Sequence, residues 1–90
     1  MRESKYVIGD IAETYGIQTN IAVVFPDTIG HDKIGRSVFV ADSIKSAGFC
    51  YINDKGRVSV YGQSVSLGVT AHHGVDEKII EKALAIRGDS

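Results

Sequence analysis

Residues 49–61 read FCYINDKGRVSVY and carry the plainest structural signal in the chain. Alternating apolar and polar residues stand on both sides of a short polar segment, Asn53-Asp54-Lys55-Gly56. Asn and Asp start turns by bonding their own backbone, and Gly supplies the positive φ that closes them. The stretch therefore predicts a β-hairpin in which Val58 and Val60 share the buried face with Cys50 and Ile52.

Two further strands are predicted before this hairpin. Tyr6 to Ala12 is the first, and Ile17 to Phe25 is the second, with Tyr15-Gly16 as the turn between them. Residues 21–25 form an apolar block, as expected of a strand covered on both faces. Pro26 lacks an N–H group and ends the second strand.

The segment from Ile34 to Ala47 has two readings. Ile34, Val38, Ala41 and Ile44 recur at helical spacing, which favours one helix that ends near Lys45 and Gly48. The β-branched and aromatic run at residues 38–40 instead suits a short strand followed by a short helix at residues 41–47. We favour the single helix, preceded by a loop over residues 27–32.

A final helix is predicted from Val75 to Arg87. Its apolar residues recur at helical spacing, and Asp76 and Glu77 lie at the end where the helix dipole favours negative charge. The expected fold is a single α+β domain over residues 1–90. It has a small mixed or antiparallel sheet of four to five strands and two helices, in the order ββαββα.

Composition limits the classes of function. The 90 residues carry ten basic and eleven acidic side chains, a formal net charge of −1, and no basic run. Nucleic-acid binding is therefore disfavoured. Cys50 is the only cysteine, and the longest apolar run, residues 21–25, is far too short to span a membrane. With a short polar N-terminus unlike a signal peptide, we expect a cytoplasmic protein without a membrane segment.

The candidate binding site is the loop from Gly62 to Gly68, which reads GQSVSLG. Its glycines allow tight turns, while Ser64 and Ser66 place hydroxyl donors beside backbone amides. Successive amides in such a loop can converge on an anion. The adjacent pair His72 and His73 follows, and one imidazole could contact the anion or transfer a proton.

Other reactive residues have ordinary interpretations. His31 is expected in an exposed loop, Tyr61 as a packing residue with a wet hydroxyl, and Cys50 as an inert buried thiol. Asp10, Asp42 and Asp54 form no recognisable pair. The chain has no zinc-type cysteine pair and no glycine-rich nucleotide-binding motif, so no metal or cofactor is expected.

The C-terminal half resembles the Janus/phosphohistidine phosphatase family. Residues 60–64, VYGQS, together with Gly68, the histidine pair and the helix containing residues 77–79, carry this resemblance. Lys5-Tyr6-Val7-Ile8 is also similar to the family's first strand, and Ala41-Asp42 to the segment after its catalytic histidine. The resemblance implies a phosphate site formed by Ser64, Val65, Ser66 and Lys5. Val40 stands where the family has its catalytic histidine, and the family's glycine-rich segment is lacking.

These observations favour a small binding or interaction domain without catalysis, because no complete set of nucleophile, base and orienting group is visible. Its expected anion site comprises Lys5, Gly62, Ser64, Val65, Ser66, His72 and His73. The alternative is a phosphohistidine-phosphatase-like hydrolase that uses a histidine beside the loop. A partner-binding module acting through an open sheet edge is a third possibility, and such an edge would also permit a homodimer.

Overall fold

Six strands and two helices make up the described part of the chain. The computed structural model describes residues 3–88. The elements are β1 (Glu3–Glu13), β2 (Gly16–Pro26), α1 (His31–Val38), β3 (Ser46–Ile52), β4 (Val58–Tyr61), β5 (Gln63–Ser64), β6 (Val69–Thr70) and α2 (Asp76–Gly88). β1 to β4 form one antiparallel sheet in the order β2-β1-β3-β4, and β5 pairs with β6. The predicted α+β class is confirmed, and the predicted order ββαββα roughly matches, with the β5–β6 pair added before α2.

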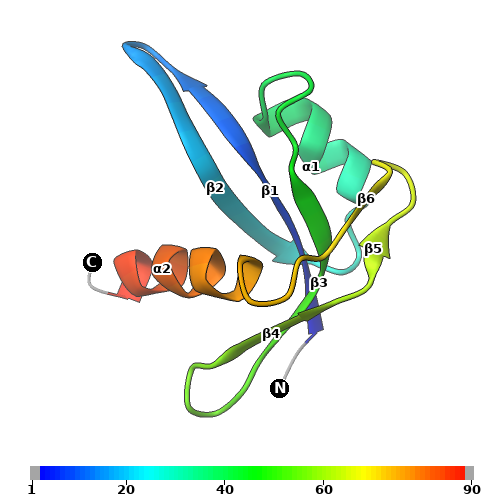
Figure 1. Cartoon of the computed structure of the whole chain (residues 1–90), viewed down its shortest axis with the longest axis vertical. Helices are drawn as coiled ribbons and strands as arrows, with labels where there is room; N and C mark the ends of the chain where they lie inside the picture. The colour runs from blue at the N-terminus through cyan, green and yellow to red at the C-terminus, as the bar shows by residue number, and fades with distance from the viewer. Residues whose placement is uncertain (1–2, 89–90) are drawn as a thin grey trace.

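The four-stranded sheet has a covered core on each side. Along β1, side chains alternate between the two faces, so Tyr6 and Ile8 lie on one face and Val7 on the other. We name these the α2 face and the α1 face after the helix that packs on each (Figure 1). The α2-face core comprises Tyr6, Ile8, Cys50, Val58, Val60 and Ile80, and the α1-face core comprises Val7, Phe25, Phe39 and Ala47.

A β-bulge interrupts the long β1–β2 hairpin. Gly9 pairs with Ile21 but Ile11 pairs with Gln18, so two residues of β2 stand opposite Asp10. One of them, Asn20, adopts a left-handed φ of 56°. Because β3 pairs with β1 only as far as Ile8, the hairpin beyond the bulge extends as a two-stranded arm (Figure 1).

The predicted hairpin at residues 49–61 is confirmed. Val58 and Val60 are buried, and Cys50 pairs with Val60 across the strands. The Asn53 side chain accepts hydrogen bonds from the N–H groups of residues 55 and 57, each at 2.9 Å. Gly56 has a φ of +79°, as the turn requires.

Neither reading of residues 34–47 is correct. Helix α1 begins earlier, at His31, and ends at Val38, and residues 39–45 form neither a strand nor a helix. After Val38 the backbone bonds to the bulge instead: Val40 N–H donates to the Asp10 carbonyl at 2.8 Å. The Ser43 hydroxyl also bonds this segment, at 2.7 Å from the Val40 carbonyl. Tertiary hydrogen bonds thus override the helical spacing of the apolar residues.

The final helix is confirmed, as α2. Ile80 is fully buried against the sheet, and Ile79 and Leu84 pack beside it, as the apolar stripe predicts. Val75, which the stripe included, lies before the helix and is exposed. Neither helix within residues 3–88 is long and apolar enough to cross a membrane.

Candidate anion-binding loop

The loop from Gly62 to Gly68 folds as a tight hairpin. Gly62 and Gly68 both have left-handed φ values, +78° and +70°, which a side chain would disfavour. Gly68 N–H donates to the Ser64 carbonyl at 2.9 Å and closes the turn. The Ser64 side chain is buried, and its hydroxyl accepts a hydrogen bond from Leu67 N–H at 3.3 Å. Ser64 therefore holds the shape of the turn from inside.

The tip of this turn presents unengaged backbone donors. Within residues 3–88, the N–H groups of Val65 and Ser66 have no hydrogen-bond acceptor. Val65 is 84% exposed and Ser66 is also exposed, with its hydroxyl 3.3 Å from that of Ser64. Two successive amides beside a hydroxyl are the kind of donor group that anion-binding loops use.

The loop is held against both the sheet and α1. Ala71 N–H donates to the Gly62 carbonyl at 3.1 Å, which fixes the base of the loop. At its tip, Leu67 lies against Gly35 of α1, where an added Cβ would stand 3.1 Å from the leucine side chain. The donors at the tip are thus carried on a supported hairpin.

Charge near the loop is compatible with an anion. No Asp or Glu occurs between Asp54 and Asp76, so the loop itself carries no acidic side chain. Helix α1 presents Arg36 immediately after the glycine that contacts the loop. One carboxylate does lie near its base, because Tyr61 donates its phenolic hydrogen to Glu3, and this bond raises the pKa of Tyr61 to about 12.

Lys5 lies on the α1 face of the sheet. It stands between Phe25 and Phe49 in the strand register, and its Nζ donates to the Ile29 carbonyl at 3.0 Å. Val40, which the sequence resemblance would align with a catalytic histidine, donates its N–H to the Asp10 carbonyl. Asp10 is five residues further along β1 than Lys5, which corresponds to about 16 Å. Lys5 and Val40 are therefore not brought to one point.

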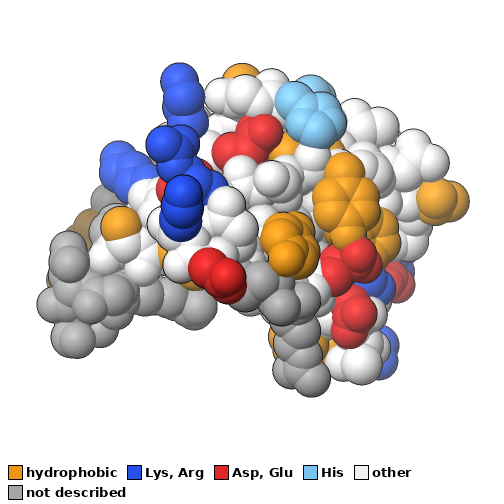
Figure 2. Space-filling model, turned by 90° about the horizontal axis from the view of Figure 1, so that it is seen from below, with side chains coloured by type: hydrophobic (Ala, Val, Ile, Leu, Met, Phe, Trp, Pro, Cys, Tyr) orange, Lys and Arg blue, Asp and Glu red, His pale blue; other side chains and the backbone are white. Residues whose placement is uncertain are grey.

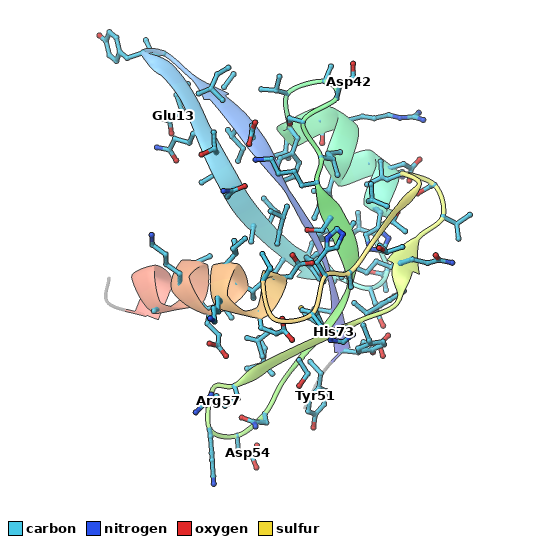
Figure 3. The ribbon with its side chains drawn as sticks, viewed as in Figure 1. Glu13, Asp42, Tyr51, Asp54, Arg57 and His73 are labelled. Carbon is cyan, nitrogen blue, oxygen red and sulfur yellow. The ribbon has the colours of Figure 1, made fainter. Side chains whose placement is uncertain are left out.

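His72 and His73 lie at the approach to α2. Figure 3 shows His73 in the segment that leads into this helix. Both histidines line an open cavity of about 330 Å³, together with Asn20 and Lys45, and no residue of the 62–68 loop lines it. His73 Nδ1 is 3.7 Å from a carboxylate oxygen of Glu77. The predicted site residues are thus distributed over three places: the loop, the Lys5 position and this histidine cavity.

Lys45 gives the histidine cavity a fixed cation. Its Nζ lies 3.2 Å from Asp10 Oδ1 and 2.7 Å from Asn20 Oδ1, so it joins the two sides of the β-bulge. Asn20 N–H also points at Asp10 Oδ1, at 3.3 Å. These contacts join the two strands at the bulge, and they engage two of the three ammonium hydrogens.

Asp76 is the polar residue that sequence reasoning missed. It is buried, and its Oδ2 accepts hydrogen bonds from the Tyr6 hydroxyl at 2.5 Å and from His72 N–H at 2.9 Å. Its Oδ1 accepts from the Ser46 hydroxyl at 2.9 Å. Burial and the bond to Asp76 raise the pKa of Tyr6 far above its ordinary value. The sequence did contain a signal for a buried polar partner, because a tyrosine in a buried strand needs a hydrogen-bond partner for its hydroxyl.

The expectation for His31 is wrong. The side chain is buried, and its ring lies edge-on to Phe25 and Phe49, with centroid distances of 5.7 and 5.6 Å. Nε2 donates to the Gly48 carbonyl oxygen at 2.8 Å. This histidine therefore packs the start of α1 onto β3 and is committed to a structural contact.

Cys50 and Tyr61 match their expected roles. Cys50 is fully buried, and burial raises the pKa of its thiol to about 11, so it is inert at neutral pH. Tyr61 stacks on Phe49 at 5.8 Å and keeps its hydroxyl at the surface. In Figure 2, basic side chains gather over α2, and hydrophobic side chains with acidic ones beside them lie on another part of that face.

Within residues 3–88, no group of three or more His, Cys, Asp or Glu side chains is placed to hold a metal ion. The arrangement defines a small two-sided α+β domain with a donor-rich surface hairpin. Comparison of the chain with protein-family models, with curated proteins and with solved structures found no match.

Proposed function

We propose that this domain is a non-catalytic binding module that takes a phosphate-like anion at the Gly62–Gly68 loop. The observation that carries this proposal is the pair of unengaged amides at Val65 and Ser66. Each amide gains an acceptor only when a ligand or water supplies one, and an anion satisfies both together.

The loop's internal bonding supports this function. Because Ser64 accepts the Leu67 amide and Gly68 bonds back to Ser64, the turn does not need a ligand to take its shape. A preorganised loop loses little conformational freedom on binding. The site is shallow and has few donors, so we expect weak binding of inorganic phosphate and tighter binding of a larger phosphorylated ligand.

The roles of the site residues differ in this proposal. Val65 and Ser66 supply the direct contacts through their amides, and Ser66 adds its hydroxyl. Ser64 and the two glycines shape the turn. Lys5 and the two histidines make their contacts elsewhere, so they do not contact the anion in this proposal.

An amide NMR titration with inorganic phosphate and phosphoamino acids tests the proposal. We expect saturable shifts confined to the amides of residues 62–68. The turn between β3 and β4 is an internal control, because its Lys55 and Arg57 amides already donate to Asn53. A titration that moves both turns equally, or neither, contradicts the proposed site.

A matched pair of variants isolates the backbone donor. Val65→Pro removes one N–H at the second position of the turn, where proline is well tolerated, and Val65→Ala keeps it. We expect phosphate affinity to fall several-fold in Val65→Pro and to stay unchanged in Val65→Ala. Turnover of a phosphohistidine substrate that is lost in His72→Ala or His73→Ala would instead establish the hydrolase alternative.

A further inference from the structure

Strand β2 forms an open edge of the sheet. Among the described residues 3–88 it has one neighbouring strand, β1, and it is eleven residues long. None of its residues, GIQTNIAVVFP, is charged, and its only proline is the last residue. Edge strands of soluble proteins are usually short or carry charges, because an uncharged edge invites pairing with another strand. The β2 edge has neither protection.

The opposite edge differs from β2. Strand β4 has four residues, and the chain turns directly from it into the β5–β6 hairpin. Arg57 immediately precedes β4, and Figure 3 shows its side chain at the turn. A long added strand therefore has room to pair at β2 and not at β4.

Helix α2 covers space beyond the β2 edge. It packs on β2, and its later turns continue past that strand (Figure 1). An open cavity of about 380 Å³ lies between the two elements, lined by residues 19–22 of β2 and by Ile79, Lys82 and Ala83 of α2. A strand added beside β2 would lie beneath the projecting part of the helix. This placement points to a strand as the occupant of the edge.

We propose that β2 pairs with β2 of a second copy of this chain, antiparallel, to form a symmetric dimer. An uncharged strand meets its own copy without repulsion between like charges, and a two-fold axis makes the edge complementary to itself. A charged partner strand would find no opposite charge on β2. This inference is independent of the anion site, because the 62–68 loop follows β4 at the opposite edge of the sheet.

The bulge determines the register. Between Ile21 and Pro26 the strand pairs regularly with β1, whereas the bulge disturbs the part before Ile21. A two-fold axis at Val23 sets Ile21 of each copy opposite Phe25 of the other, and Ala22 opposite Val24. Phe25 belongs to the α1-face core and Val23 packs against it, while Ala22 and Val24 pack against the α2-face core. The Ala22–Val24 pairs therefore fall on the α2 face of the joined sheet and the Val23 pair on its α1 face.

Exposed apolar side chains lie on the arm beyond the bulge, outside the residues that pair in this register. Tyr15 at the arm's tip is fully exposed, and Ile17 is 60% exposed. A two-stranded ribbon is marginal on its own. A partner sheet at β2 would widen the base of this arm from two strands to three.

Sedimentation analysis over a wide concentration range tests the proposal. We expect a monomer–dimer equilibrium in the wild type. Val23→Lys places two like charges at the axis, and we expect it to shift the midpoint to at least about tenfold higher concentration. Ser59→Lys on exposed β4 is the matched control and should leave the midpoint unchanged. A wild type that stays monomeric, or equal effects of both variants, overturns the proposal.

A second measurement needs no variant, and so it holds even if Val23→Lys fails to fold. In a mixed sample of labelled and unlabelled chains, isotope-filtered NMR should show contacts between Ile21 of one copy and Phe25 of the other. Their absence in a sample that sediments as a dimer would place the interface elsewhere and refute the β2 pairing.

Discussion

The buried carboxylate of Asp76 ties α2 to the sheet, and its removal should be the most damaging polar substitution in the domain. The carboxylate accepts from the hydroxyls of Tyr6 on β1 and Ser46 on β3, and from the backbone of His72. All three groups donate to the carboxylate, so its removal takes away the acceptor that they share. Asp76→Ala would leave two buried hydroxyls and one amide without an acceptor.

The size of the effect follows from those three donors. An unsatisfied buried donor costs about 1–3 kcal/mol, and His72 lies near water, which relieves part of its share. We expect Asp76→Ala to lower the free energy of unfolding by about 3–5 kcal/mol. A domain of this length has roughly 5–13 kcal/mol in total, so the loss takes a large fraction of it.

Urea unfolding followed by circular dichroism measures this effect. Tyr6→Phe alone removes one donor and should cost about 1–2 kcal/mol. In the Asp76→Ala background the same change should cost almost nothing, because the hydroxyl it deletes is already without a partner. Asp54→Ala, at the exposed β3–β4 turn, is the control and should change stability by less than about 0.5 kcal/mol. Additive effects of Tyr6→Phe and Asp76→Ala would refute the proposed network.

Three further predictions concern single buried groups. Burial raises the pKa of the Cys50 thiol from 9.0 to about 11, so the unfolded chain loses this proton at a lower pH than the folded chain. The free energy of unfolding should therefore fall by about 1–3 kcal/mol as the pH rises from 9 to 11. Urea unfolding should show a smaller fall over this pH range in Cys50→Ala. His31→Ala should cost about 2–4 kcal/mol by removing a packed ring, while His73→Ala at the surface should be nearly neutral, as thermal unfolding can show. Gly48→Ala places a Cβ 2.7 Å from the Tyr61 carbonyl oxygen, and calorimetry should find it destabilised by more than about 2 kcal/mol.

Local patterns were sufficient to predict the elements whose bonding is local. The β3–β4 hairpin was predictable because Asn53 and Gly56 form its turn from within the sequence. Helix α2 was predictable because its apolar stripe faces a single layer. The α1 region was not, because the segment at residues 39–45 bonds to Asp10 of β1, some 30 residues earlier. Spacing of apolar residues carries no information on such a distant acceptor.

The candidate site also has features that depend on neighbouring residues and features that depend on distant ones. The shape of the 62–68 turn depends on two glycines and Ser64, all adjacent in sequence, and so the loop was predictable. Whether His72 reaches that loop depends on which way the chain leaves β6 and on the bond of its amide to Asp76. His31 was misjudged for a related reason: its neighbours Phe25 and Phe49 come from two other strands.

The two proposals have a joint geometric consequence. Because the loop follows β4 and the proposed interface is β2, pairing would leave both loops at the outer ends of an eight-stranded sheet. Seven inter-strand steps of about 4.8 Å put the two β4 strands roughly 34 Å apart. A ligand with two anionic groups at about that spacing would engage both loops, and its second contact would be effectively intramolecular. Weak single-site binding by the loop would then suffice for tight binding by the dimer, and Val23→Lys should weaken a bivalent ligand while leaving inorganic phosphate binding unchanged.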